Sequence, residues 1–141
     1  MEYVEGESLR RLLSRPGGIS ARFARSILQQ VLAGLAEAHA QGVTHRDLKP
    51  ENIMVANDSA VKIMDFGIAR SAEGGATLPG VLIGTPAYMS PEQAEGRPAD
   101  ARSDLYSLGL IAYEMFTGQP DRKSTRLNSS HIQKSRMPSS A

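Results

Sequence analysis

The chain contains no cysteine, so disulfide bonds and thiolate metal sites are excluded. It also lacks an apolar run of the roughly 20 residues that a membrane-spanning helix needs. The first residues, MEYVEGESL, have neither the basic flank nor the apolar stretch of a signal peptide. The formal net charge of the 141 residues is only +1, which argues against a nucleic-acid-binding protein. These absences favour a soluble, cytoplasmic segment without membrane contact and with one domain-sized core.

Glycine and aromatic residues are also absent after residue 120, which divides the chain into two unequal parts. Residues 121–141, DRKSTRLNSSHIQKSRMPSSA, are basic and rich in serine, without helical or strand periodicity. This string resembles a translated sequencing-library adapter, so we expect an artefactual, disordered tail and base no functional argument on it. The alternative is a natural tail that binds nucleic acid, for which salt-sensitive DNA binding lost on its deletion would be the evidence.

Capping residues and apolar spacing predict three helices in residues 1–120. Ser8 is expected to cap a short helix that the sequence RPGG at 15–18 ends. Ser20 is expected to cap a longer helix that ends at Gly42, because apolar residues recur at helical spacing between the two. A third helix, 103–118, is apolar on nearly every face, which predicts burial on all sides.

Two short apolar segments, 53–55 and 61–64, predict a small β-hairpin around the turn sequence ANDSA. The stretch 71–84 is rich in glycine and has no clear period, which is typical of a long surface loop with a functional role.

The stretch THRDLKPENIMV at 44–55 concentrates charged residues between apolar neighbours, which indicates a polar loop held against a core. Taken singly, its residues have ordinary explanations. Asn52, and Asp65 further along, could be turn residues, and Lys49 could be a solvated charge. A lone His45 beside apolar residues is most simply a packed side chain.

Three further segments follow this stretch in order: DFG at 65–67, GTPAYMSPE at 84–92 and DLYSLG at 104–109. Together the four segments resemble the C-terminal lobe of a protein kinase. HRDLKPEN is similar to the serine/threonine branch, and the two later segments are similar to the bacterial group.

The resemblance implies an α+β fold, a mainly helical kinase C-terminal lobe with a small β-hairpin and no N-terminal lobe. It covers residues 1–120, from the hinge to the central helix. A working kinase also needs a glycine-rich loop and a strand lysine, and neither precedes Met1. We therefore expect a fragment that is poorly soluble and inactive alone, although its parent is an enzyme that uses ATP and Mg²⁺ on protein substrates.

Five residues are expected to carry phosphoryl transfer by this resemblance. Asp47 would accept or orient the proton of the substrate hydroxyl, and Lys49 would compensate charge on the moving phosphate. Asn52 and Asp65 would offer hard oxygen ligands to magnesium. Thr85 would bridge Asp47 and Lys49 and favour serine or threonine substrates.

Other matched positions are expected to be structural or regulatory. Three residues would connect the catalytic loop, the DFG segment and the central helix: His45, Phe66 and Asp104. Gly67 is the last residue of the DFG segment. Arg46 would pair with a phosphorylated residue of the long loop, for which Thr77 is the candidate and Ser71 the fallback. Glu92 would need an arginine from a later helix that this chain does not contain.

The opening residues MEYVEG resemble the hinge that binds adenine. There the backbone of Glu2 and Val4 would hydrogen-bond the base, and Met54 would form the apolar floor beneath it.

Three alternatives remain at this stage. A non-catalytic, kinase-like docking module would be expected to lack Asp47, Lys49, Asn52 or Asp65, and all four are present. The evidence for a nucleic-acid-binding protein would come from the tail alone. Kinship with small-molecule phosphotransferases is disfavoured by the GTPAYMSPE segment, which in kinases shapes a shelf for peptides.

Overall fold

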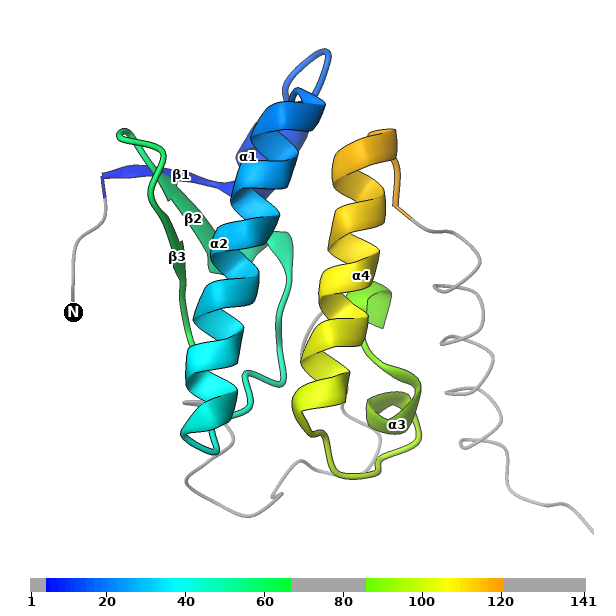
Figure 1. The fold of residues 1–141 in the computed structure, drawn as a ribbon. Helices are drawn as coiled ribbons and strands as arrows, with labels where there is room; N and C mark the ends of the chain where they lie inside the picture. Colours follow the sequence, from blue (N-terminus) through cyan, green and yellow to red (C-terminus); the bar gives the residue numbers. More distant parts are fainter. Residues whose placement is uncertain (1–4, 67–85, 121–141) are drawn as a thin grey trace, which may run out of the picture.

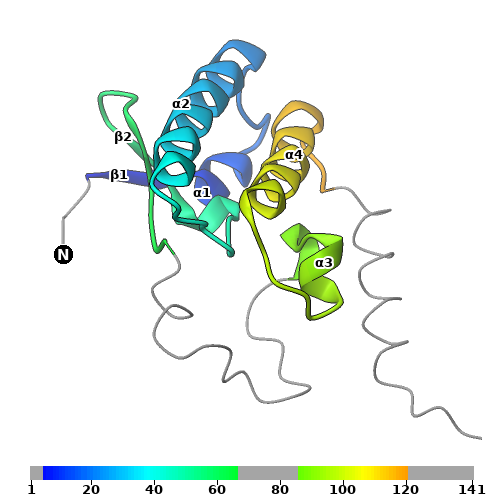
Figure 2. The same cartoon turned by 60° about the horizontal axis from the view of Figure 1, so that its bottom comes forward.

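A computed structural model of the chain describes residues 5–66 and 86–120 (Figure 1). In chain order the elements are β1 (Gly6–Ser8), α1 (Leu9–Leu13), α2 (Ala21–Ala40), the short 3-10 helix η1 (Pro50–Asn52), β2 (Ile53–Ala56), β3 (Val61–Ile63), the 3-10 helix η2 (Pro86–Tyr88), α3 (Pro91–Ala94) and α4 (Ala101–Thr117). Figures 1 and 2 show α2 between the sheet and α4. The expected α+β architecture is confirmed, whereas its assignment to one lobe stays a prediction.

Helices α1 and α2 begin where the capping pattern predicts. The side chain of Ser8 accepts a hydrogen bond from the backbone N–H of Arg11, and that of Ser20 accepts one from Phe23. Apolar residues of α2 at helical spacing are buried: Ala24, Ile27, Val31 and Leu35. Gly42 follows α2 with φ 78°, a left-handed conformation that glycine adopts without steric cost.

Helix α4 differs from its prediction in two ways. It begins two residues earlier, because Asp100 is the N-cap and Ser103 completes a capping box with it. The expectation of burial on all sides is wrong, since Leu105, Tyr113 and Phe116 are about half exposed. The described neighbours of α4 cover its other face, where Asp104 and Glu114 are also buried.

The predicted hairpin forms from β2 and β3, with Ile53 opposite Ile63. The sequence did not predict β1, which adds a third antiparallel strand in the order β1-β2-β3. A Cβ atom on Gly6 would lie 2.2 Å from the carbonyl oxygen of Val55, so β1 can approach β2 this closely only because position 6 is glycine.

A buried cluster joins these elements, with members from α1, α2, β2 and α4 such as Leu9, Ile27, Ile53 and Ile111. Full burial of one such side chain stabilises a fold by about 1.5 to 3 kcal/mol. Among the described residues, no helix is both long enough and apolar enough to span a membrane.

Candidate active site

The polar loop at 44–52 lies between α2 and β2 and includes η1, and His45 anchors it in the interior. His45 is fully buried, and its Nε2 lies 2.7 Å from the carbonyl oxygen of Met64. Its ring centroid lies 4.7 Å from that of Phe66. The loop is therefore held directly against the segment that follows β3.

Asp104, in the first turn of α4, organises the backbone of the same loop. Its carboxylate accepts hydrogen bonds from the backbone N–H groups of His45 at 2.8 Å and Arg46 at 2.9 Å. His39 Nε2, from the last turn of α2, lies 2.8 Å from the same carboxylate. Because Asp104 is only 1% exposed, these three contacts replace the solvation that burial removes. Sequence reasoning missed His39, whose position beside Asp104 depends on how α2 and α4 pack.

Arg46 has a positive φ of 75°, an unusual conformation for a residue with a side chain. Such a conformation costs on the order of 1 to 3 kcal/mol and persists where its surroundings fix it. Asp104 holds the N–H of Arg46, and Gln93 Nε2 donates to its carbonyl oxygen at 2.6 Å. The Arg46 side chain is exposed.

Asp47 follows this fixed turn and presents its side chain to solvent. Its backbone N–H donates to His45 Nδ1 at 3.1 Å, while its carboxylate is 47% exposed. Lys49 Nζ lies 3.4 Å from that carboxylate. The loop thus brings an accessible carboxylate and a cation together at one surface point.

Asn52 and Asp65 lie at the open end of the β2–β3 hairpin. The backbone N–H of Met64 donates to the Asn52 carbonyl at 2.7 Å, one step beyond the Ile53–Ile63 pair. The Asn52 side chain donates through Nδ2 to the Asp47 carbonyl oxygen at 2.7 Å, which fixes its amide beside the loop. Asp65, at φ 58°, is exposed.

These residues have the chemistry of a magnesium site shared with phosphate. Amide and carboxylate oxygens are hard ligands, which Mg²⁺ prefers, and it usually takes only one or two from protein when substrate phosphates complete its shell. Within the described ranges, no group of three or more His, Asp or Glu side chains could hold a metal ion without such help.

Met54 lies on the face of β2 opposite to the buried Ile53 and Val55, and it is partly exposed. The other residues expected at the nucleotide, the substrate or the regulatory loop lie outside the described residues: Glu2, Val4, Gly67, Ser71, Thr77 and Thr85.

Glu92 has a partner in the described structure that the sequence did not predict. Ser103 Oγ donates to its carboxylate at 2.5 Å. This hydrogen bond is the main cause that lowers the pKa of Glu92, and the charge of Arg97 adds to it. The contact links the start of α3 to the first turn of α4.

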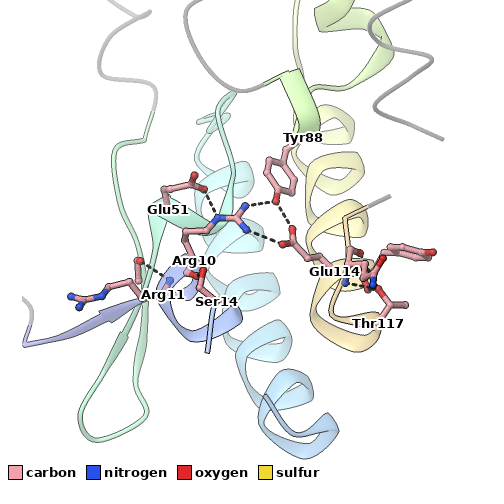
Figure 3. A network of polar contacts seen from close by, with 10 residues as sticks. Arg10, Arg11, Ser14, Glu51, Tyr88, Glu114 and Thr117 are labelled. Atoms are coloured by element: carbon pink, nitrogen blue, oxygen red, sulfur yellow. Dashed lines mark hydrogen bonds and ion pairs between the residues drawn. The ribbon is translucent and has the colours of Figure 1, made fainter. Parts of the chain in front are cut away.

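A second polar cluster, which we call the Arg10 cluster, joins Arg10, Glu51, Tyr88 and Glu114 (Figure 3). Arg10 Nη1 donates to the Glu114 carboxylate at 2.8 Å, and Arg10 Nε lies 3.6 Å from the Glu51 carboxylate. The Tyr88 hydroxyl accepts from Arg10 and donates to Glu114. Sequence reasoning missed this cluster, because Arg10 and Glu114 are 104 positions apart.

Burial and charge set the protonation of the Arg10 cluster. Burial, followed by the hydrogen bond to Glu114, raises the pKa of Tyr88 to about 12. Burial alone would lower the pKa of Arg10, but its bonds to Tyr88 and Glu114 outweigh that effect and raise it. The cluster therefore holds a protonated phenol and a guanidinium between two glutamates.

Comparison with known protein families matches residues 1–139 to the protein kinase domain. The chain belongs to this family.

Curated kinases of bacteria are similar to the chain over most of its length. Serine/threonine-protein kinase PknB of Mycolicibacterium smegmatis is 49% identical over 123 residues, 85% of this chain and 20% of that protein. Serine/threonine-protein kinase PknL of Mycobacterium tuberculosis is 48% identical over 119 residues, 84% of this chain and 30% of that protein. The resemblance to bacterial serine/threonine kinases is thus confirmed, and the chain spans less than a third of either relative.

The family match extends past residue 120 and so into the segment that resembles an adapter. The predicted division of the chain at residue 120 stays a prediction.

The raised pKa of Tyr88 predicts a loss of stability of this kinase segment at alkaline pH. Between about pH 10 and 12 the unfolded chain releases the phenol proton while the folded chain retains it, so the free energy of unfolding falls as pH rises. Tyr88→Phe should remove a component on the order of 2 kcal/mol from that fall, measured by denaturant unfolding of the full-length gene product at several pH values. Tyr113→Phe, which removes a half-exposed phenol of α4, should leave the parent's pH dependence in place. A Tyr88→Phe variant with the same dependence as the parent would contradict the prediction.

Proposed function

We propose that the chain forms the catalytic-loop half of a serine/threonine protein kinase, which transfers the γ-phosphate of ATP to serine or threonine hydroxyls of proteins. The observation that carries this proposal is the hydrogen bond from Asn52 Nδ2 to the Asp47 carbonyl oxygen, 2.7 Å long. This bond connects Asn52, a candidate magnesium ligand, to Asp47, the candidate proton acceptor. Kinase family membership and the similarity to named serine/threonine kinases support the same reaction.

Asp47 would accept the proton of the substrate hydroxyl while the hydroxyl oxygen attacks the γ-phosphorus. The new P–O bond forms while the bond to the β–γ bridging oxygen breaks, and ADP leaves with the electron pair. Magnesium, when bound, neutralises charge on the nucleotide phosphates. Asn52 and Asp65 would hold it, and Lys49, 3.4 Å from Asp47, would offset charge on the transferred group.

The remaining predicted roles belong to the same proposal. The exposed side chain of Arg46 is available to pair with a phosphate on Thr77 or Ser71, a charge-assisted contact able to order a segment. Glu2 and Val4 would bind adenine through their backbone above Met54, and Thr85 would favour hydroxyl substrates. The reaction would take place in the cytoplasm, with proteins as substrates. The kinase would have an N-terminal and a C-terminal lobe, and this chain would supply the C-terminal lobe.

Transfer of radiolabelled γ-phosphate from ATP by the full-length gene product tests the proposal. We expect label on serine and threonine of acceptor proteins, none on tyrosine, and complete loss when a chelator removes magnesium. Label on tyrosine alone, or transfer that continues in the chelator, would overturn the assignment.

Asp65→Asn should raise the magnesium concentration for half-maximal transfer by about 10- to 100-fold, because it retains an oxygen ligand but loses the charge. Asp58→Asn makes the same charge change at the other, turn end of the hairpin, where Asp58 accepts from the Ala60 N–H, and should leave the magnesium requirement unchanged. Equal requirements in both variants would exclude Asp65 as a ligand.

A further inference from the structure

The peptide unit that joins Arg46 to Asp47 is held at both of its edges. Its oxygen, the carbonyl oxygen of Arg46, accepts a hydrogen bond from Gln93 Nε2 at 2.6 Å. Its N–H, that of Asp47, donates to His45 Nδ1 at 3.1 Å. Because a peptide unit is planar, contacts on opposite edges fix its rotation. They thereby fix the direction in which the Asp47 side chain leaves the backbone.

The two contacts come from different parts of the fold. The His45 ring is fully buried and bonded to the carbonyl oxygen of Met64, so the N–H edge is held from the interior. Gln93 belongs to α3, which Figures 1 and 2 show beside the N-terminal end of α4. The carbonyl edge is therefore held by an element outside the catalytic loop.

The Gln93 amide is itself fixed at its other end. Its Oε1 accepts hydrogen bonds from the backbone N–H of Ser90 at 3.2 Å and from the Ser90 hydroxyl at 3.0 Å, and Ser90 is fully buried. The first of these bonds belongs to the capping box of α3. Since a carbonyl oxygen can only accept, the amide group that faces Arg46 is the donor. Gln93 thus has two separable roles: Oε1 caps α3, and Nε2 holds the loop.

We propose that Gln93 is a positioning residue for phosphate transfer: its Nε2 fixes the Arg46–Asp47 peptide unit and so aims the Asp47 carboxylate at the substrate hydroxyl. The inference rests on the proposed function. Arg46 requires such support, because its φ of 75° is unfavourable for a residue with a side chain. Asp104 bonds only the preceding peptide unit, through the Arg46 N–H. Without the donor of Gln93, the Arg46 carbonyl would turn toward solvent and Asp47 would adopt orientations that miss the hydroxyl.

Three substitutions of Gln93 in the full-length gene product separate its two roles. Gln93→Glu keeps the oxygen that completes the capping box, where glutamate serves as well as glutamine, but sets an acceptor against the Arg46 carbonyl. Gln93→Lys keeps a donor for that carbonyl and loses the capping oxygen. Gln93→Met, of similar length, removes both without adding charge. Gln29→Glu, at an exposed position of α2, is the matched control for the added charge.

Gln93→Glu and Gln93→Met should lower kcat by about 10- to 100-fold, because a misplacement on the order of 1 Å at the reacting groups costs up to this factor. The KM for ATP should stay within about 2-fold in both, since neither change touches the nucleotide. Gln93→Lys should retain more than about a fifth of the parent kcat, and Gln29→Glu all of it.

The midpoint of thermal unfolding should follow a different order. It should fall by about 2 to 4 °C in Gln93→Lys, which loses the cap, and change least in Gln93→Glu. A kcat that follows the unfolding midpoint across the variants would mean that Gln93 acts on stability alone, and would overturn the inference. So would a kcat of Gln93→Glu within about 3-fold of the parent, or a Gln93→Lys variant as impaired as Gln93→Met.

Hydrogen exchange separates this inference from the proposed function. If the unsubstituted protein transfers no phosphate, the proposed function fails, and the exchange of backbone amides in segment 44–52, followed by mass spectrometry, still decides what Gln93 does. Faster exchange there in Gln93→Glu and Gln93→Met, but not in Gln93→Lys or Gln29→Glu, supports the hold on the peptide unit. Equal exchange in all these proteins contradicts it. Should Gln93→Met fail to fold, the other two variants decide the question, because each keeps one of the two contacts.

Discussion

Asp47→Asn is expected to lower kcat for phosphate transfer by about 10²- to 10⁴-fold, the range typical of losing a positioned acid or base. The substitution changes little else. Asp47 holds its place through its backbone N–H, bonded to His45 Nδ1, and its carbonyl, bonded to Asn52. Its side chain is 47% exposed, and the Nζ atom of Lys49 lies 3.4 Å from its carboxylate. An amide of the same size should therefore fold normally and only fail to accept the proton.

Steady-state kinetics of the full-length gene product measures this effect, with the KM for ATP and the midpoint of thermal unfolding as controls. Both controls should stay close to those of the unsubstituted protein. A kcat within about 3-fold of the parent would remove Asp47 from the reaction. A large fall in the unfolding midpoint would instead show that its carboxylate stabilises the loop.

Asp104→Ala is expected to lower the free energy of unfolding by about 3 to 5 kcal/mol, as found when one partner of a buried charge network is removed. The change leaves the backbone N–H groups of His45 and Arg46 without their acceptor, and each buried unpaired donor costs about 1 to 3 kcal/mol. It also frees the positive φ of Arg46 to relax, since that conformation depends on its surroundings. Phosphate transfer should fall with stability, because Asp47 is the next residue.

Asp100→Ala is the matched control, since it removes a carboxylate from the same helix. Asp100 caps α4 and bonds the Arg102 N–H, so its loss should cost only about 1 kcal/mol. Denaturant unfolding of both variants tests the comparison. Equal losses would mean that the Asp104 carboxylate serves merely as a helix-end charge and does not hold the loop.

The part of the fold that the sequence predicted depends on short-range rules. Helix α2 was predictable because Ser20, the apolar spacing and Gly42 all act within one turn of the residues they affect. The start of α4 was misplaced because Asp100 and Ser103 are both good capping residues, and only the three-dimensional structure distinguishes the cap from its partner in the capping box. Strand β1 was missed because three residues carry no period, and its pairing depends on the close approach that Gly6 permits.

The same distinction between short-range and long-range contacts applies to the candidate site. Four candidate site residues were predicted because they lie in motifs read directly from the chain: Asp47, Lys49, Asn52 and Asp65. The contacts that hold them were not, because His39 and Asp104 are 65 positions apart and meet only once α2 and α4 pack. The Arg10 cluster belongs to the same class of long-range contact, and an arginine on a short helix gives no sign of it.

The Asp104 carboxylate has a mechanical consequence as well as an energetic one. It connects the last turn of α2, the first turn of α4 and the loop between α2 and β2 through contacts of 2.8 to 2.9 Å. Neighbouring residues of a helix are displaced by about 1.5 Å along its axis, so sliding α4 by even one residue would break all three contacts together. These two helices and the loop should therefore travel as a rigid body, and any opening or closing that accompanies turnover must pivot elsewhere in the protein.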